Sequence, residues 1–303
     1  MKKEKAVVTG GAGFIGSHVV DELVARGFDV HIIDNLSRGN KNNVNEKATL
    51  HIEDIRNFSD IFPIFDGAKY VFHLAAEPRV EFSIQHPVES NDINVNGTLN
   101  VLIAARDAKV KRVVFSSSCA VYGDQEQMPL IESVSAVPKS PYGVHKYVGE
   151  LYCKMFSDIY DLETVSLRYF NVYGPRHNSE GAYALVIAKF FALLSQGKNL
   201  TITGDGKTTR DYVNVKDIVG ANMLAMESAS VGKGEYFNIG TGIETSVLDI
   251  AKLVGGEVEF IASRVEPKRA VADSGLAQSV LGWKPAVDLM GGIEELKKLA
   301  NIS

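Results

Sequence analysis

The sequence predicts an α/β fold built on a doubly wound parallel sheet. A short β-branched run at Lys5–Thr9 ends in glycines, and it is followed by a helical pattern and a second strand-like run at residues 29–34. Strand-like and helical patterns then alternate over about 170 residues. Alternation of this kind is typical of a parallel sheet with helices on both of its faces.

Each element has its own signal. The first helical pattern has apolar residues at helical spacing and runs up to Gly27, which we expect to end the helix. Apolar runs rich in β-branched and aromatic residues predict further strands at residues 48–52, 70–74, 112–116 and 164–168. Helical spacing predicts helices at residues 98–109 and 142–159.

The regular winding stops in a turn-rich passage that begins near residue 170. We expect residues 171–303 to form a smaller substrate-binding region from which some segments return to the first domain. The pattern there predicts a helix at 182–195, a strand at 199–203, a loop at 204–210 and a last helix at 292–300. In a sheet of this type a ligand is expected above the carboxyl ends of the strands.

Composition excludes several functional classes. The 303 residues carry a net charge of −5, which gives no attraction for nucleic acid or anionic lipid. No apolar run reaches the ~20 residues of a membrane-spanning helix, and no leader-like segment opens the chain. Cys119 and Cys153 are too few for a disulfide framework and have no metal-ligand spacing. We therefore expect a cytoplasmic protein that needs no metal.

The segment TGGAGFIG at residues 9–16 lies between the first strand and the first helix. Gly10 permits a tight turn, Gly13 lets the backbone approach a pyrophosphate, and Gly16 allows close packing. The helix N-terminus then favours the negative charge. Asp34 ends the second strand, where a carboxylate can accept hydrogen bonds from the adenine-ribose hydroxyls and would repel a 2′-phosphate. Residues 1–170 are thus expected to be a Rossmann domain that binds NAD rather than NADP.

A candidate catalytic group follows from Tyr142 and Lys146, which stand four residues apart in a helical pattern and share one helix face. Ser118 follows a strand-like run, at the carboxyl edge where the nicotinamide is expected. A free phenol has a pKa near ~10, and a neighbouring ammonium and a positive nicotinamide ring would both lower it. Tyr142 could then take a proton from a sugar hydroxyl while hydride leaves the same carbon.

Together these motifs resemble the extended short-chain dehydrogenase/reductase superfamily. The resemblance also rests on SSSCAVYG at residues 116–123, SPYGVHK at 140–146 and LRYFNVYGPR at 167–176, and it extends to about Trp283. Within the superfamily the chain is most similar to NAD-dependent UDP-sugar 4-epimerases of the UDP-glucose and UDP-N-acetylglucosamine type. The resemblance implies reversible epimerisation at C4 of a UDP-hexose through a transient 4-keto sugar, with NAD held throughout.

The resemblance also implies the roles of particular residues. Ser118, Tyr142 and Lys146 are the expected catalytic residues. The expected cofactor contacts are Gly10, Gly13, Phe14, Ile15, Gly16, Asp34, Asn35, Asp54, Ile55, Leu74, Ala75, Ala76, Asn94, Tyr142, Lys146 and Tyr169. The expected substrate contacts are Ser118, Asn171, Arg210, Arg264 and Ala270. Helices near residues 92–109 and 142–159 are expected to form a homodimer.

Three further residues bear on the choice among relatives. Dehydratases and decarboxylases of this superfamily carry an acidic residue where this chain has Ala120. Ala270 is small, which is associated with acceptance of N-acetylated sugars, whereas the segment after Arg264 departs from the usual Arg-Pro-Gly-Asp. Arg79 could meet an acidic sugar, so a UDP-glucuronate 4-epimerase stays open. Another nucleotide-sugar oxidoreductase and an NAD-binding regulatory protein without catalysis also stay open.

Overall fold

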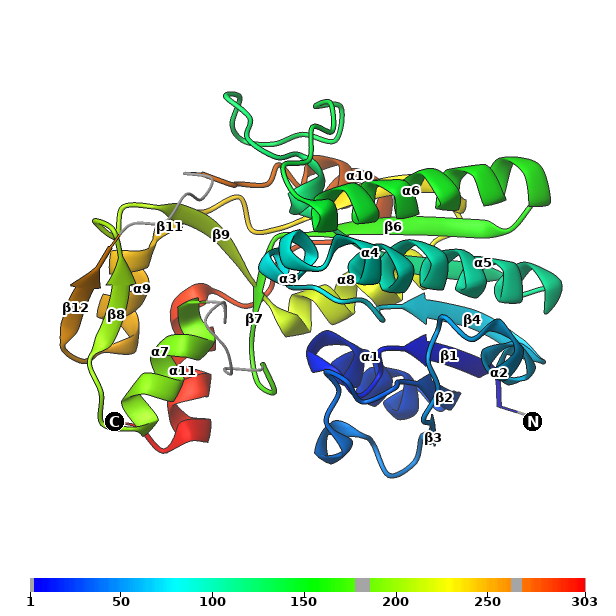
Figure 1. Cartoon of the computed structure of the whole chain (residues 1–303), viewed down its shortest axis with the longest axis horizontal. Helices are drawn as coiled ribbons and strands as arrows, with labels where there is room; N and C mark the ends of the chain where they lie inside the picture. Colours follow the sequence, from blue (N-terminus) through cyan, green and yellow to red (C-terminus); the bar gives the residue numbers. More distant parts are fainter. Residues whose placement is uncertain (1–2, 178–185, 263–268, 303) are drawn as a thin grey trace.

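A computed structural model describes residues 3–177, 186–262 and 269–302 (Figure 1). Seven strands form the main sheet, in the order β10-β6-β5-β4-β1-β2-β3, and all of their pairings are parallel. They are β1 (Lys5–Thr9), β2 (Asp29–Ile33), β3 (Thr49–His51), β4 (Ala68–His73), β5 (Arg112–Ser118), β6 (Glu163–Tyr169) and β10 (Lys233–Ile239). The predicted doubly wound parallel sheet is therefore confirmed.

Helices cover both faces of this sheet because successive strand side chains point to opposite sides. One face carries α1 (Phe14–Ala25), α8 (Val215–Glu227) and α10 (Gly275–Leu281). The other carries α5 (Gly97–Asp107) and α6 (Pro141–Tyr160), with the short helices α2 (Phe58–Ile61), α3 (Val80–Gln85) and α4 (Pro87–Asn91) beside them. In β1, Ala6 and Val8 face the first layer and Val7 faces the second.

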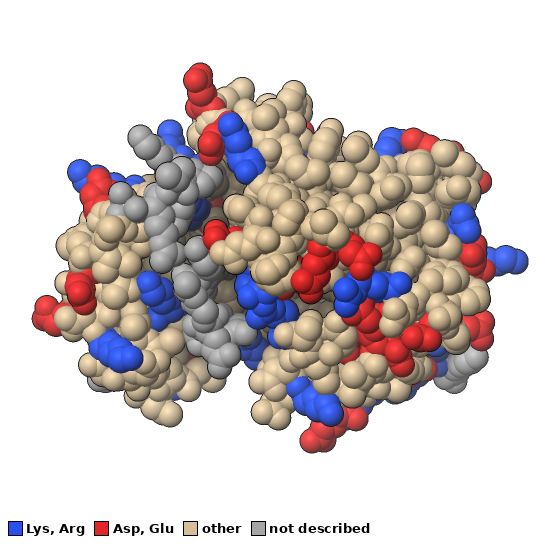
Figure 2. Space-filling view, viewed as in Figure 1, with Lys and Arg blue, Asp and Glu red and all other residues tan. Residues whose placement is uncertain are grey.

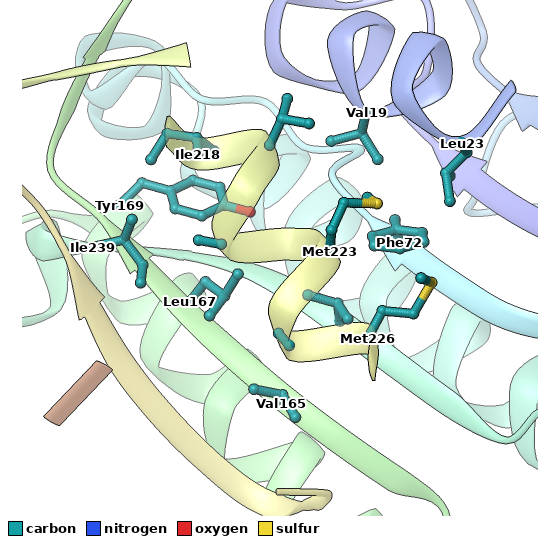
Figure 3. Packing of buried hydrophobic residues seen from close by; sticks show 14 of the residues in the cluster. Val19, Leu23, Phe72, Val165, Leu167, Tyr169, Ile218, Met223, Met226 and Ile239 are labelled. Atoms are coloured by element: carbon teal, nitrogen blue, oxygen red, sulfur yellow. The ribbon is translucent and has the colours of Figure 1, made fainter. Parts of the chain in front are cut away.

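An apolar core lies on each face of the main sheet, and the larger of these two cores includes the side chains between the sheet and α8. Figure 3 shows Met223 and Met226 of α8 directed toward Phe72, while Leu167 and Tyr169 of β6 lie along the same helix. All of these side chains are at most 7 % exposed. Such burial is the main source of stability for the domain, at roughly 25 cal/mol for each Å² of apolar surface removed from water.

A smaller lobe follows the main sheet. It contains the sheet β11-β9-β7 and the parallel pair β12-β8. Its strands are β7 (Asn171–Tyr173), β8 (Leu200–Thr203), β9 (Thr209–Asn214), β11 (Glu244–Ser246) and β12 (Val258–Ile261), and its helices are α7 (Val186–Ser195), α9 (Val247–Val254) and α11 (Leu289–Ala300). Phe190, Ile202, Ile250 and Ile293 meet in its core.

The six strands and three helices predicted for the first domain are present, with ends shifted by a few residues. The sequence patterns did not predict β10, which returns from the second half of the chain to pair with β6, or α8, which covers the sheet beside it. The loop expected at residues 204–210 is too long, because β9 already begins at Thr209. Part of the helix expected at 182–195 lies outside the described residues, and the described part is α7.

Among the described residues, none of the helices is both long and apolar enough to span a bilayer. Within the same residues, no three His, Cys, Asp or Glu side chains are grouped so that they could hold a metal ion.

Candidate active site

The glycine-rich turn after β1 leaves no space for side chains. Gly10 has a φ of +72°, and a Cβ built on it would lie 2.7 Å from the main-chain nitrogen of Ala75. A Cβ on Gly16 would lie 2.1 Å from the carbonyl oxygen of Gly10, so α1 packs directly on the turn. Gly13 precedes α1 and provides no side-chain cap. The turn is thus a bare backbone cradle at a helix N-terminus, which fits a dinucleotide's pyrophosphate.

Asp34 lies next to this cradle with its carboxylate already fixed. Its two oxygens accept hydrogen bonds from the N–H groups of Ala12 at 3.0 Å and of Leu36 at 2.8 Å. Burial raises the pKa of this carboxyl, and the two hydrogen bonds oppose that shift. A Cβ on Gly39 would lie 2.6 Å from Oδ1, so the loop that follows β2 folds tightly around the group. This arrangement fits a ribose with free hydroxyls.

The loop after β3 would form the wall of the adenine pocket. Arg56 donates two hydrogen bonds to the Asp54 carboxylate, at 2.9 and 2.7 Å, and Asn35 donates a third at 2.8 Å. The hydrogen bonds from Arg56 are the largest cause that lowers the pKa of Asp54 to about 2. The Asn100 amide donates to the carbonyl oxygen of Ile55 at 3.0 Å. The Asp54 carboxylate is therefore occupied, which leaves the backbone of this loop for a cofactor contact.

The loop Leu74, Ala75 and Ala76 after β4 is held by a polar chain in the core. The N–H of Ala75 donates to Thr9 Oγ1 at 3.2 Å, and Thr9 Oγ1 lies 2.7 Å from Nδ1 of His73. Nε2 of His73 lies 2.9 Å from Thr98 Oγ1, which donates to the Asn94 carbonyl at 2.6 Å. Since the Thr98 hydroxyl gives its only proton to Asn94, Nε2 of His73 carries the donating proton. The far end of the loop is fixed by Asn94, whose Oδ1 accepts from the N–H of Glu77 at 2.8 Å.

Ser118, Tyr142 and Lys146 come together at the carboxyl end of β5. Ser118 is the last residue of that strand, and the other two lie in the first turns of α6. Nζ of Lys146 donates to the Ser116 carbonyl at 2.7 Å and lies 5.8 Å from the centre of the Tyr142 ring. A Cβ on Gly143 would lie 2.6 Å from the carbonyl oxygen of Ala120, so the start of α6 is seated on the turn after β5.

The electrostatics of this group differ from the expectation based on sequence. Burial raises the pKa of Tyr142 to about 12, and the hydrogen bond with Ser118 opposes the shift. Burial lowers the pKa of Lys146 to about 8, which Cys153 and Glu150 oppose. Desolvation disfavours both charged forms and is the largest cause of each shift. The lower phenol pKa expected from the sequence is therefore not a property of the protein alone, and the positive nicotinamide ring is the remaining charge that would favour phenolate.

A buried ion pair supports the same part of α6. Arg168 of β6 donates to both oxygens of Glu150, at 2.8 and 2.7 Å, and both side chains are at most 4 % exposed. Ser117, next to Ser118, donates to the same carboxylate. Arg168 also donates to the Tyr122 hydroxyl at 2.8 Å. The sequence patterns did not predict this pair, which connects β6 with the helix of Tyr142, while Ser117 connects the strand of Ser118 to the same carboxylate.

The described candidate substrate residues of the smaller lobe each share a hydrogen bond with the backbone of that lobe. The Asn171 amide donates to the Asp211 carbonyl at 3.1 Å, and Nη1 of Arg210 donates to the Thr209 carbonyl at 2.8 Å. The carbonyl of Ala270 accepts from the N–H of Asp211 at 3.0 Å. Arg264 lies outside the described residues. Figure 2 shows Lys and Arg side chains on both sides of the boundary between the small lobe and the main sheet.

Asp211 is a further buried residue that the sequence patterns did not predict. Its carboxylate is fully buried and accepts hydrogen bonds from Thr241, Gly242 and Ala272. It therefore joins β9 to two other segments, near residues 241 and 272. The position of Asp211 between Arg210 and Tyr212 in a strand-like segment could have marked it as a buried acidic residue. Its hydrogen-bond partners could not be predicted, because they are distant in the sequence.

The remaining predicted contacts differ in their surroundings. Phe14 and Ile15 begin α1, and the ring of Phe14 stacks on that of His177 with 4.6 Å between centroids. Tyr169 packs in the core against α8 (Figure 3), and its hydroxyl is bonded to Asn222 at 3.1 and 2.8 Å. Because the Tyr169 hydroxyl is already bonded to Asn222, Tyr169 could contact a cofactor only through its backbone or the edge of its ring.

Arg79, the reason for keeping an acidic sugar open, is paired within the chain. It donates to both oxygens of the Glu77 carboxylate at 2.8 Å. Its guanidinium also lies 4.7 Å from the centre of the Phe82 ring. A guanidinium held in this way is a poor candidate for binding a substrate carboxylate.

Comparison with known proteins gives consistent results. A family model described as the NAD dependent epimerase/dehydratase family matches residues 6–240. A UDP-glucose 4-epimerase of Mycolicibacterium smegmatis is 38 % identical over 307 residues, covering 95 % of this chain and 96 % of its own. The crystal structure of a Thermotoga maritima UDP-glucose 4-epimerase with UDP-glucose has a TM-score of 0.92 at 38 % identity and covers 97 % of this chain and 99 % of its own.

A second solved structure is similar to the same degree. The UDP-N-acetylglucosamine 4-epimerase of Methanobrevibacter ruminantium, in complex with UDP-N-acetylmuramic acid, has a TM-score of 0.91 at 37 % identity. The match covers 99 % of this chain and 100 % of that one. Proteins named for two different UDP-sugars are therefore about equally similar to this chain.

Proposed function

Since the chain belongs to the NAD dependent epimerase/dehydratase family, we propose that it interconverts UDP-hexoses that differ in configuration at C4. The observation that carries the proposal is the meeting of Ser118, Tyr142 and Lys146 at the carboxyl end of β5, on the sheet that also presents the glycine cradle. NAD held at the glycine cradle would supply the hydride acceptor in the first half of the cycle and the hydride donor in the second.

Side chains of the protein accept and return the proton of the C4 hydroxyl. Tyr142 takes the proton of the C4 hydroxyl while the C4 hydrogen leaves as hydride, which yields a 4-keto sugar. Ser118 holds the same oxygen by a hydrogen bond, and the Lys146 ammonium favours the phenolate that precedes the transfer. When the keto sugar presents its other face, hydride returns to C4 and Tyr142 returns the proton. The net reaction inverts C4 and consumes no cofactor.

Substrate binding divides between the two parts of the chain. We assign residues 1–170 mainly to NAD and residues 171–303 mainly to the UDP-sugar. Arg210 and Arg264 would hold the diphosphate, for which a guanidinium is well shaped, and Asn171 would face the sugar. Ala270, whose backbone bonds to Asp211, would leave space beside C2 for an acetamido group. The substrates are UDP-glucose and UDP-galactose, their N-acetylated counterparts, or both pairs.

Two observations favour epimerisation over related reactions. Ala120 provides no carboxylate for water elimination or decarboxylation beside Ser118 and Tyr142. Arg79 is bound to Glu77, which weakens the case for a uronate substrate.

We also infer a cytoplasmic homodimer. Helix α6 carries a row of apolar side chains on its outer surface: Val144 is 43 % exposed, Leu151 52 % and Ile159 63 %. A second copy of this chain could cover such a row with its own α6, because parallel apolar stripes pack well in a helix bundle.

One experiment separates the competing functions. The purified protein is incubated with UDP-galactose, UDP-N-acetylgalactosamine or UDP-glucuronate without added nicotinamide nucleotide, and the products are separated by chromatography. We expect the C4 epimer of one or both of the first two. A released keto sugar, formed with consumption of one added NAD for each sugar, would indicate a net oxidoreductase. Absence of turnover on all three, in protein that retains NAD, would indicate a binding protein.

A further inference from the structure

An ion pair joins two loops at the carboxyl edge of the main sheet, where the cofactor is expected to lie. Nε of Arg38 lies 3.4 Å from Oε2 of Glu77. Arg38 belongs to the loop after β2, and Glu77 follows the loop after β4. In the sheet, β1 lies between these two strands (Figure 1). The pair therefore spans the carboxyl end of β1, over the glycine turn.

The Glu77 end of this bridge is rigid. Its side chain is only 7 % exposed. Arg79 donates to both of its carboxylate oxygens, while the Asn94 amide is bonded to its backbone N–H at 2.8 Å and to its carbonyl at 3.0 Å. Since a carboxylate offers about four acceptor positions, Arg79 leaves capacity for a second guanidinium. Glu77 is thus a fixed anion beside the crevice.

The loop that carries Arg38 is anchored to the glycine turn, whereas the Arg38 side chain is partly exposed. The loop that carries it is tied to the glycine turn, because the N–H of Asn40 and the amide of Asn43 both donate to the Ala12 carbonyl, at 2.9 and 3.2 Å. The Arg38 side chain itself is 42 % exposed. An exposed guanidinium on an anchored loop can leave its partner and return without any change in the fold.

We propose that Arg38 and Glu77 form a gate over the dinucleotide crevice, which must open both for entry and for exit of NAD. The inference rests on the proposed use of the glycine turn for NAD. A gate of this kind suits an enzyme that reuses one cofactor molecule, since it slows exchange without tightening the equilibrium. In this proposal Arg38 controls the exchange of NAD and takes no part in the proton transfer.

A gate differs measurably from a direct ligand. A residue that only blocks the opening raises the barrier for both directions, so its loss speeds association and dissociation by the same factor. A guanidinium that binds the pyrophosphate stabilises only the bound state, so its loss speeds dissociation and weakens the affinity by a similar factor. Comparing the two rate constants therefore identifies the role.

The test uses the full-length protein and NADH as a fluorescent probe. Association is followed by stopped flow after the nucleotide has been removed, and dissociation is followed by displacing bound NADH with excess NAD. For Arg38→Gln we expect both rate constants to rise about two- to five-fold, the range for an exposed ion pair, with the affinity changed less than two-fold. Arg38→Lys keeps the charge and should recover part of the slow exchange.

Arg26→Gln is the matched control. Arg26 also forms exposed ion pairs, with Glu22 and Glu227, but it follows the far end of α1. It should leave both rate constants unchanged. Higher ionic strength should speed both processes in the wild type and have less effect in Arg38→Gln.

Two results would overturn the gate. Faster dissociation with unchanged association in Arg38→Gln would make Arg38 a ligand of the cofactor, and unchanged rates in both directions would leave the ion pair without a role. Sugar turnover by the same preparations tests the proposed function separately, because gated exchange requires no epimerisation. A wild type that binds neither NAD nor NADH would overturn both.

Discussion

Glu150 and Arg168 form a two-point ion pair in the layer directly behind the catalytic group, with oxygen to nitrogen distances of 2.8 and 2.7 Å. The carboxylate lies one helical turn after Lys146 and also accepts a hydrogen bond from Ser117. The pair therefore fixes the rotation of α6 relative to β6, and the hydrogen bond from Ser117 ties the same carboxylate to β5. It also places a negative charge near the Lys146 ammonium.

Removal of either member of the Glu150–Arg168 pair should lower the free energy of unfolding. In Glu150→Gln, Arg168 would be left as a buried charge without its counterion, and we expect a loss of about 3–5 kcal/mol in the free energy of unfolding. Asp158→Asn is the matched control, because it breaks an ion pair with Lys154 on the same helix in which both side chains are 53 % exposed. Its cost should stay below about 1 kcal/mol. Urea unfolding measures both, and equal losses would contradict the prediction.

Loss of the Tyr142 hydroxyl should remove the reaction and retain the fold. In Tyr142→Phe the group that exchanges the C4 proton is absent, so we expect turnover to fall by about 10²–10⁴-fold. Tyr147→Phe, on the same helix, is the control and should keep most of the activity. The measurement is initial rate together with the amount of bound NAD. Undiminished turnover in Tyr142→Phe would contradict the assigned base.

Local motifs made much of this site predictable from the sequence. The glycine turn, Asp34, and the spacing of Tyr142 and Lys146 each depend on residues that are near one another in the chain, and a parallel strand-helix unit then fixes where they lie. The carboxyl edge of a parallel sheet collects the residues that follow its strands. For that reason Ser118 could be assigned to the site before its neighbours were known.

The rest depends on partners that are distant in the sequence. β10 pairs with β6 across more than 60 residues, and Asp211 accepts from segments near residues 241 and 272. The orientation of Tyr169 is decided by Asn222 of α8, and the sequence gives no sign of that contact. The sequence also does not show that burial raises the phenol pKa in the protein alone, because the degree of burial is a property of the packed structure.

Ala270 should control which sugar pair is accepted. A larger side chain at this position would occupy the space assigned to the acetamido group at C2, so Ala270→Tyr should lower turnover of UDP-N-acetylgalactosamine much more than that of UDP-galactose. We expect the ratio of the two kcat/KM values to change by at least about ten-fold, or ~1.4 kcal/mol in transition-state binding. Ala270→Ser is the matched small substitution and should leave the ratio near its original value. An unchanged ratio in Ala270→Tyr would show that the position does not select the sugar.

His73 should make the protein sensitive to acid. Its buried ring is bonded to Thr9 and Thr98, and burial lowers its pKa to about 3. The unfolded chain therefore takes up a proton near pH 6.5 while the folded protein does not, so the stability from this group is present above pH 6.5 and is lost as the pH falls towards 3. The slope is about 1.4 kcal/mol for each pH unit, or about 2 kcal/mol between pH 6.5 and 5.

The comparison that isolates this effect is His73→Gln, whose stability should change less with pH over the same interval, whatever its value at neutral pH. His86→Gln replaces an exposed histidine and should follow the wild type. Urea unfolding at half-unit pH intervals gives the three curves. If His73→Gln lost stability on acidification as steeply as the wild type, the buried ring would have to be protonated in the folded state, and the hydrogen-bonded chain from Ala75 to Asn94 would have to contain the imidazolium.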